Sequence, residues 1–537
     1  MKREKKTLSM KTRRILTLVK YLFALGVTVF AFTGMDSKKY LFGSLLELAV
    51  IVLLSDLFAR RWPKAGNIIS SILTLLYNTQ QFILYFGSTY LTMIMLTNIS
   101  SAEDLGGRAF EYILAIVLVI VLSCLPVCPI RLKRIYVYNA LIGIMIVDLG
   151  FTMTLGSSYS PLYGYANVAV QAKEQHDREV YINSLPDTAE QFYSDSVESG
   201  IDKPADLPEQ PNVILIMTEG LSQSIVEDER NLMPNVRSYE DQSVDFESYF
   251  NHTAATYRGI IGQLFSGYQN NNLDQNHLVS IQSIMKDQGY YTSFINTEMN
   301  NVQFTGYLND LGFDDVIGKD SDSYLTDKEA YDLLLETAEE QSSKGQPFFT
   351  TIYTFNTHVS LDSDDEKYGD GSEAELNKFY NCDYQFGRFM DAFNNSDLAD
   401  NTIIVFTADH CTYLDDAFRS AFPDTARVHS FLDRIPFFIY YKGVTPQKIS
   451  ADGRNSLCMV PTILDYLDIS APNYFLGNSL FININNDFSP YDLVFNIDNT
   501  ERVSTKDAII QGMDSSVDSE VEKNINNYYA AAQQERK

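Results

Sequence analysis

Polar side chains that can bind a metal follow two short apolar segments of the sequence. Glu219 comes just after residues 213–217, and Asp409 and His410 come just after residues 402–406. A continuous apolar run is typical of a strand buried on both faces of a parallel sheet. Adjacent Asp and His offer a divalent cation one carboxylate oxygen and one imidazole nitrogen. The structural alternatives are a first-turn helix carboxylate for Glu219 and an ordinary polar pair for Asp-His.

A threonine at the start of an expected short helix is a candidate nucleophile. Thr256 begins the segment Thr-Tyr-Arg-Gly-Ile-Ile-Gly, which follows a polar loop. The N–H groups and dipole at a helix N-terminus favour an anion such as phosphate. A metal on the threonine oxygen would lower its pKa enough for attack near neutral pH. The alternatives are a helix cap, or Thr253 as the nucleophile, since residues three apart lie on nearly the same helix face.

Histidine is scarce in this chain, and its placement is informative. Of the six histidines, His358, His410 and His429 lie just after or between apolar strand segments. An imidazole at a strand end can act as a general acid or stabilise a developing negative charge. We therefore expect His358 to contribute to the same site as the Asp-His pair.

The elements that position these residues alternate between strands and helices. This alternation predicts an α/β/α domain with a mainly parallel, doubly wound sheet, in which sites form beyond the carboxyl ends of the strands. The expected strands are 213–217, 291–295, 348–354, 402–406 and 436–441, and the expected helices are 281–288, 328–341, 373–394 and 459–467.

The first third of the chain is predicted to lie in a membrane. Apolar runs of about 20 residues are long enough to cross a bilayer core. Loops that we expect on one side carry 13 Lys/Arg, against 3 in the alternate loops, which predicts a cytoplasmic N-terminus and an extracellular C-terminal domain. The five expected spans are 15–35, 40–58, 68–96, 109–127 and 135–153.

Charge divides the chain in the same way. Residues 1–150 carry a net charge of +9, and the remainder carries −37, for a total of −28. This acidity argues against nucleic acid as a partner. Five cysteines without a CxxC motif exclude a dense disulfide scaffold. The expected organisation is a five-span membrane domain (1–153), a linker (154–211), a catalytic domain (212–485) and a C-terminal extension (486–537).

The ordered set of motifs resembles a known family. A strand ending in Glu, a Thr-led helix 37 residues later, a strand-end His, Asp-His, and then Arg-Ile-Pro-Phe-Phe-Ile-Tyr follow one another. This order resembles the lipoteichoic acid synthase and phosphoethanolamine transferase branch of the alkaline phosphatase/sulfatase superfamily. The resemblance covers about residues 211–485 and includes the segments 461–467 and 476–481.

The resemblance implies roles for individual residues. One divalent metal, with Mn²⁺ expected first and Zn²⁺ or Mg²⁺ as alternatives, would be bound by four side chains, one of which is the nucleophile Thr256. His358 would contact the transferred group or the leaving oxygen, and His429 a second metal or the substrate. Arg258 and Glu298 are further expected substrate contacts. The four expected metal ligands are Glu219, Thr256, Asp409 and His410.

The sequence also departs from parts of the superfamily. Sulfatases carry a Cys or Ser nucleophile in a Cys-x-Pro-x-Arg context and paired Asp ligands, whereas this chain has Thr-Tyr-Arg-Gly and a single Glu. Sulfate-ester hydrolysis is therefore disfavoured. Residues 296–313 lack the Arg that grips glycerol phosphate in lipoteichoic acid synthases.

The implied function is transfer of a phospholipid headgroup, glycerol phosphate first, to a cell-envelope glycan or glycolipid. Phosphatidylglycerol is the expected donor, and a phospho-threonine the expected intermediate. The alternatives are a phosphoethanolamine transferase, a phosphodiesterase that uses water, and a non-catalytic surface protein.

Overall fold

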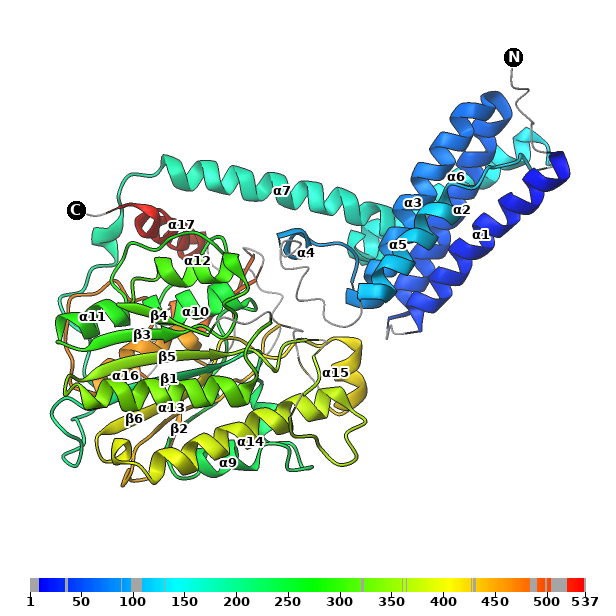
Figure 1. Cartoon of the computed structure of the whole chain (residues 1–537). Helices are drawn as coiled ribbons and strands as arrows, with labels where there is room; N and C mark the ends of the chain where they lie inside the picture. Colours follow the sequence, from blue (N-terminus) through cyan, green and yellow to red (C-terminus); the bar gives the residue numbers. More distant parts are fainter. Residues whose placement is uncertain are drawn as a thin grey trace, which may run out of the picture. The chain divides into compact units, whose positions relative to one another are not determined.

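The chain is described by a computed structural model, shown in Figure 1. It divides into two compact units, Met1–Arg178 and Glu179–Lys537, and each is described by itself. The structure describes residues 9–33, 37–87, 89–97, 109–130, 132–319, 323–359, 361–363, 365–425, 427, 431–482, 490–497, 500–503 and 519–535.

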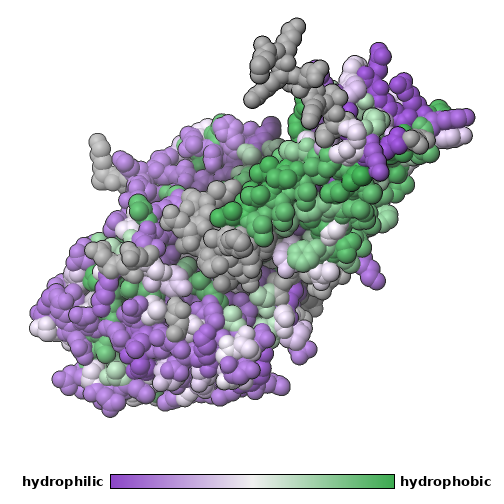
Figure 2. Space-filling view, turned by 45° about the vertical axis from the view of Figure 1, so that its right-hand side comes forward, coloured by the Kyte–Doolittle hydropathy of each residue, from purple (hydrophilic) through white to green (hydrophobic). Residues whose placement is uncertain are grey.

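The first unit is helical, and three of its described helices are long and apolar enough to cross a membrane. Large apolar side chains, Ile116 and Ile146 among them, are exposed on its surface. Figure 2 shows hydrophobic residues gathered over these helices. This pattern suits a lipid environment, because a water-soluble surface rarely exposes so large an apolar patch. The three candidate spans are α1 (Met10–Phe32), α2 (Lys38–Arg61) and α6 (Arg134–Leu155).

The other two expected spans have helical counterparts that differ in character. α3 (Pro63–Gly87) is 25 residues long but buries polar side chains such as Asn78 and Gln81 among its neighbours. The side-chain amide nitrogens of Asn78 and Gln81 donate to the hydroxyls of Ser123 and Ser44 at 2.9 and 3.1 Å. α5 (Ala109–Ser123) has 15 residues and is shorter than a full span. Two further helices, α4 (Met93–Thr97) and α7 (Pro161–Ser184), complete the described helices numbered up to α7.

The second unit is built on an eight-stranded sheet that contains the five predicted strands and three that the sequence does not predict. Parallel pairs join β4, β3, β5, β1 and β6. β7 is antiparallel to both of its neighbours, so the sheet is mixed but mainly parallel. The strands, in spatial order, are β4 (Asp315–Ile317), β3 (Tyr291–Ile295), β5 (Phe348–Thr354), β1 (Asn212–Thr218), β6 (Thr402–Ala408), β7 (Phe437–Tyr440), β2 (Val244–Glu247) and β8 (Gln447–Ser450).

The helices of this unit cover the sheet and begin where their sequences signal a start. α13 (Asp327–Ser343) opens with a capping box, in which the Thr326 and Glu329 side chains each accept the other's backbone N–H. α13 packs against α14 (Ala374–Asn394) and lies in front of the sheet in Figure 1. The remaining helices of the unit are α8 (Gln223–Val226), α9 (Pro234–Glu240), α10 (Thr256–Phe265), α11 (Ile281–Asp287), α12 (Val302–Asp310), α15 (Asp416–Ala421), α16 (Met459–Tyr466) and α17 (Ser519–Gln533).

The core lies on both faces of the three central strands. Every residue of β1, β5 and β6 is buried, including threonines such as Thr350 and Thr351 within β5. The C-terminal helix α17 adds a second apolar cluster, in which Tyr528 and Tyr529 pack with Tyr268 and Leu457. A small antiparallel pair, β9 (Val494–Ile497) and β10 (Thr500–Val503), precedes α17.

Candidate functional site

The site forms where three central strands end side by side. β1 pairs in parallel with β6 and with β5, and its last residue, Thr218, lies opposite Ala408 on one side and Thr354 on the other. The residues that directly follow these strands therefore meet at one edge of the sheet. Glu219 and the Asp409-His410 pair are brought together in this way, and all three are fully buried.

The polar atoms of this cluster are close enough to share a cation. One ligand atom from each of Glu219, Asp409 and His410 lies within 4.8 Å of the others. His410 Nε2 is 3.5 Å from Glu219 Oε1 and 3.5 Å from Asp409 Oδ2. His410 Nδ1 faces the Cys411 carbonyl oxygen at 2.8 Å, which orients the ring with Nε2 toward the carboxylates.

Thr256 is the fourth residue of the site. Its hydroxyl donates to Glu219 Oε2 at 3.0 Å and lies 3.5 Å from His410 Nε2. The N-cap of α10 is Ala255, so Thr256 is the first helical residue and its hydroxyl does not cap the helix. The rival, Thr253, is buried and its hydroxyl makes no hydrogen bond to any described residue. Of the two threonines, the geometry places Thr256 on the carboxylate cluster.

Two close approaches hold α10 against the end of β6. A Cβ atom on Gly259 would lie 2.5 Å from the Asp409 carbonyl oxygen, so only glycine fits there. One turn further along α10, the Gln263 side-chain amide donates to the carbonyl oxygens of Ala408 and Asp409 at 2.9 and 3.2 Å. These contacts fix the helix that carries Thr256 relative to the strand that carries two of the other site residues.

The pKa values of the two buried carboxyl groups are shifted in opposite directions. Burial raises the pKa of Glu219, but the charges of His410 and His358, with hydrogen bonds from Tyr353 and Thr256, outweigh it and hold the pKa below its ordinary value. Burial and the charge of Glu219 raise the pKa of Asp409 to about 8. Burial lowers the pKa of His410, but the two carboxylates outweigh this and raise it. The cluster therefore has a strong preference for added positive charge.

Hydrogen bonds from the backbone and from a tyrosine orient the carboxylates. Gly220 N–H donates to Asp409 Oδ1 at 2.9 Å, and Gly220 has φ of +49°, which favours glycine. The Tyr353 hydroxyl donates to Glu219 Oε2. Sequence reasoning missed Tyr353, because it belongs to the apolar run of β5. Its register opposite Met217, two residues before Glu219, is the signal that could have identified it.

The other predicted site residues lie at different places. His358 is half-buried, stacks on Phe355 with ring centroids 4.9 Å apart, and is near enough to Glu219 to lower its pKa. Arg258 is buried beside Thr256 on α10, and its Nε makes no hydrogen bond among the described residues. Glu298 is buried and accepts a hydrogen bond from the Asn301 side-chain amide at 3.3 Å. Its charge helps to raise the pKa of Tyr353. His429 lies outside the described residues.

The chemistry of the donor set fits a divalent metal. Asp409 Oδ2 is buried and has no hydrogen-bond partner among the described residues, although a buried carboxylate oxygen is costly to leave unpaired. Two carboxylates, one hydroxyl and one imidazole are suitable ligands for a hard or borderline cation, and they do not select between manganese, zinc and magnesium.

Comparison with known proteins agrees with this geometry. Residues 211–469 match the sulfatase family. Over this range the chain is therefore similar in sequence to sulfatases. An alkaline phosphatase superfamily protein from Vibrio parahaemolyticus is 18% identical with a TM-score of 0.50, covering 67% of this chain and 94% of that one.

Two further solved structures are also similar to the chain. The integral membrane lipooligosaccharide phosphoethanolamine transferase EptA from Neisseria meningitidis is 13% identical with a TM-score of 0.52, covering 86% of this chain and 96% of that one. The lipoteichoic acid synthase LtaP from Listeria monocytogenes is 16% identical with a TM-score of 0.46, covering 64% and 95%. Residues 211–469 thus carry the alkaline phosphatase/sulfatase fold, and the cluster of Glu219, Asp409 and His410 at its strand ends is a candidate metal site.

The contact of α10 with β6 generates a first prediction. Gly259→Ala should reduce turnover by at least about tenfold, because the new methyl group would push Thr256 away from the carboxylate cluster and small misplacements of reacting groups are costly. Gly143→Ala on α6 is the matched control, since it is an exposed helical glycine outside the site and a Cβ there meets nothing within 4 Å. Steady-state assays and thermal unfolding of both variants would check this. Equal activity of the two variants would contradict the proposed packing constraint.

Proposed function

We propose that the chain is a membrane-anchored, metal-dependent transferase. It would move a phospholipid-derived headgroup, glycerol phosphate first, onto a cell-envelope glycan or glycolipid through a phospho-Thr256 intermediate. The observation that carries the proposal is the Thr256 hydroxyl, 3.0 Å from a Glu219 oxygen and 3.5 Å from His410 Nε2, at the N-terminus of α10. A hydroxyl in this position can be deprotonated beside an anion-binding helix end.

The first step follows from the residues present. Thr256 Oγ1 gives its proton to Glu219 Oε2, which accepts its hydrogen bond, and attacks the phosphorus of the donor. The new O–P bond forms, and the bond from phosphorus to the diacylglycerol oxygen breaks. His358 supplies the proton that the diacylglycerol oxygen takes up. A bound divalent cation would lower the pKa of the Thr256 hydroxyl and neutralise phosphate charge. Arg258, two residues after Thr256 on α10, would neutralise a phosphate oxygen, and its buried Nε without a hydrogen bond among the described residues supports this role.

The second step regenerates the enzyme. An acceptor hydroxyl attacks phospho-Thr256 and gives up its proton, with His358 now acting as the base by microscopic reversibility. The O–P bond to the acceptor forms, the bond to Thr256 breaks, and Thr256 Oγ1 takes its proton back from Glu219 Oε2. Water in place of the acceptor gives the hydrolase alternative, which the same side chains serve.

The apolar first unit supports a lipid donor. Three helices that can cross a membrane would anchor the domain with the sulfatase match at a bilayer, where phospholipid headgroups are available as substrate. The distribution of Lys and Arg between loops supports a cytoplasmic N-terminus and an extracellular catalytic domain. Phosphatidylglycerol is the proposed donor and Mn²⁺ the proposed metal.

A second headgroup is favoured by one comparison. The structural neighbour that covers 86% of this chain, including the membrane region, is named a phosphoethanolamine transferase. Residues 296–313 contain no Arg, the residue type that would grip a glycerol phosphate. Phosphoethanolamine transfer is therefore the second candidate function.

The choice between these activities can be measured directly. The full-length chain, reconstituted with Mn²⁺ in vesicles, should release diacylglycerol from headgroup-labelled phosphatidylglycerol faster than from phosphatidylethanolamine. In the presence of a glycolipid acceptor the label should move to that acceptor, whereas a phosphodiesterase would release it to water. Release from phosphatidylethanolamine alone would establish the second candidate. Release from neither lipid would contradict a phospholipid donor.

The nucleophile assignment gives a sharper prediction. Thr256→Ala should lower turnover by at least about a thousandfold, because it removes both the attacking oxygen and one metal ligand. Thr256→Ser keeps the hydroxyl and should retain part of the activity. Thr253→Ala is the neighbouring control and should leave substantial activity. Mass spectrometry of acid-quenched enzyme should find phosphate or a phosphorylated headgroup on Thr256. An adduct on Thr253 would overturn the assignment.

The role of His358 is separable from folding. His358→Gln should slow cleavage of a natural phospholipid by about 10²–10⁴-fold, since the diacylglycerol oxygen needs a proton to leave. A donor with a nitrophenol leaving group needs no such proton, so its cleavage should be much less affected. Comparing the two donors in the same preparation measures the difference. An equal loss with both donors would show that His358 is not the acid.

A further inference from the structure

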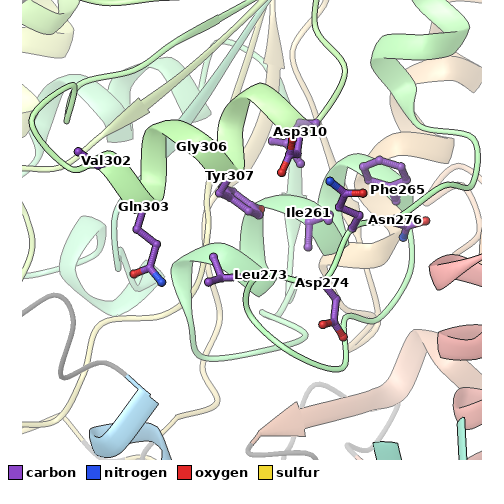
Figure 3. Close-up of a pocket in the computed structure, with 12 residues that line it drawn as sticks. Ile261, Phe265, Leu273, Asp274, Asn276, Val302, Gln303, Gly306, Tyr307 and Asp310 are labelled. Carbon is purple, nitrogen blue, oxygen red and sulfur yellow. The ribbon is translucent and has the colours of Figure 1, made fainter. Parts of the chain in front are cut away.

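A cavity lies beside the C-terminal half of α10, the helix that begins with Thr256. It has a volume of about 240 Å³ and is formed by α10, the loop 273–276 and α12. Figure 3 shows Ile261 and Phe265 on α10, with Tyr307 on α12 facing the same space. This volume is smaller than the roughly 300–1,000 Å³ typical of pockets for drug-sized ligands, so it suits one small ring.

The lining of this cavity combines an apolar floor with a polar rim. Ile261 and Tyr307 supply aliphatic and aromatic surface, and Leu273 is half-exposed at the edge. Asp274 and Asp310 lie on opposite sides of the floor in Figure 3. None of the described residues that line the cavity is Lys, Arg or His. A phosphate or another anion would therefore be repelled here rather than bound.

The polar rim is held in place by the C-terminal helix. The Gln533 amide on α17 donates to Asp274 Oδ2 at 2.9 Å, and His277 N–H donates to the Ala532 carbonyl oxygen at 2.7 Å. Asn276 Oδ1 accepts the Leu278 N–H at 3.0 Å, which fixes its side chain at the cavity wall. A site with fixed polar groups binds with a lower ordering cost than a mobile loop.

The cavity and the nucleophile are linked through helix α10. Ile261 lies five residues after Thr256, or about 7.5 Å along the helix axis. The Tyr307 hydroxyl donates to the carbonyl oxygen of Tyr257 at 2.6 Å, directly after the nucleophile. A ligand in the cavity would therefore contact the same helix that carries Thr256.

We propose that this cavity binds an uncharged sugar ring of the acceptor. The C–H face of such a ring packs on the floor formed by Ile261 and Tyr307, and its hydroxyl groups hydrogen-bond to the carboxylates and amides of the rim. The lack of cationic side chains excludes the phosphorylated donor from this place. The assignment rests on the proposed function, since it names the acceptor class of that transferase.

The test measures sugar binding apart from catalysis. The full chain carrying Thr256→Ala, in detergent, is titrated with methyl glycosides of neutral hexoses and followed by saturation-transfer NMR. Glucuronate and glycerol phosphate are the anionic probes, and glucosamine is the cationic one. The neutral glycosides should bind, and the anions should not compete with them.

Two substitutions locate the binding. Gly306→Leu fills the cavity, where an added Cβ meets nothing within 4 Å, and should abolish binding of the glycosides. Asp310→Asn removes one charge-assisted hydrogen-bond acceptor and should weaken binding about tenfold. Asp287→Asn, an exposed aspartate at the end of α11 outside the cavity, is the matched control and should bind as the parent does. Equal binding by Gly306→Leu and its parent would overturn the proposal.

The outcome can be separated from that of the proposed function. Diacylglycerol release by the wild-type chain, with water as the only acceptor, tests the donor reaction alone. If lipid is cleaved but no neutral glycoside binds, the sugar site is wrong and the transferase or hydrolase assignment stands. If glycosides bind in the cavity but no phospholipid is cleaved, the donor assignment fails. Preferential binding of glucuronate, glycerol phosphate or glucosamine would also overturn the neutral-sugar assignment.

Discussion

The parallel pairing of β1 with β6 is the constraint on which the site depends. It sets Thr218 opposite Ala408, so Glu219 and the Asp409-His410 pair must emerge side by side at one edge of the sheet. Two carboxyl groups are thereby buried within reach of a single imidazole. Burying like charges together is unfavourable unless a cation compensates them. The fold therefore fixes a position at which positive charge is favourable, and a divalent metal would supply that charge.

The nucleophile is positioned by a different kind of contact. α10 is not part of the sheet, and its alignment rests on the fit of Gly259 against the Asp409 carbonyl and on the Gln263 amide. This arrangement makes Thr256 the first helical residue, with the N–H groups of the first turn beside its hydroxyl. In the proposed mechanism, the same helix end receives phosphate charge while the cluster activates the oxygen. A single rigid helix thus links anion binding to nucleophile activation.

The sequence predicts the central strands because they are buried on both faces and consist mostly of apolar residues, with threonines among them. It does not reveal β2, β4 and β8, which are short and, in the case of β8, largely exposed, so neither length nor hydropathy marks them. Glu219 and the Asp-His pair are predictable because strand-end polar residues interrupt an apolar run. Tyr353 is not predictable from the sequence, because a tyrosine inside a strand looks like a core residue. The cavity between α10 and α12 is not predictable either, because it depends on how the helices pack. The predicted count of five spans exceeds the three described helices that are long and apolar enough, since α3 carries polar side chains and α5 is short.

The central claim is that the buried cluster and Thr256 bind one metal ion together. The most direct measurement is an anomalous difference map, collected at the manganese edge from crystals of the full chain grown with Mn²⁺. The account predicts one strong peak about 2.0–2.3 Å from oxygens of Glu219, Thr256 and Asp409 and from Nε2 of His410. A map with no peak at the cluster, or a peak bound by the carboxylates while Thr256 Oγ1 points away, would contradict it.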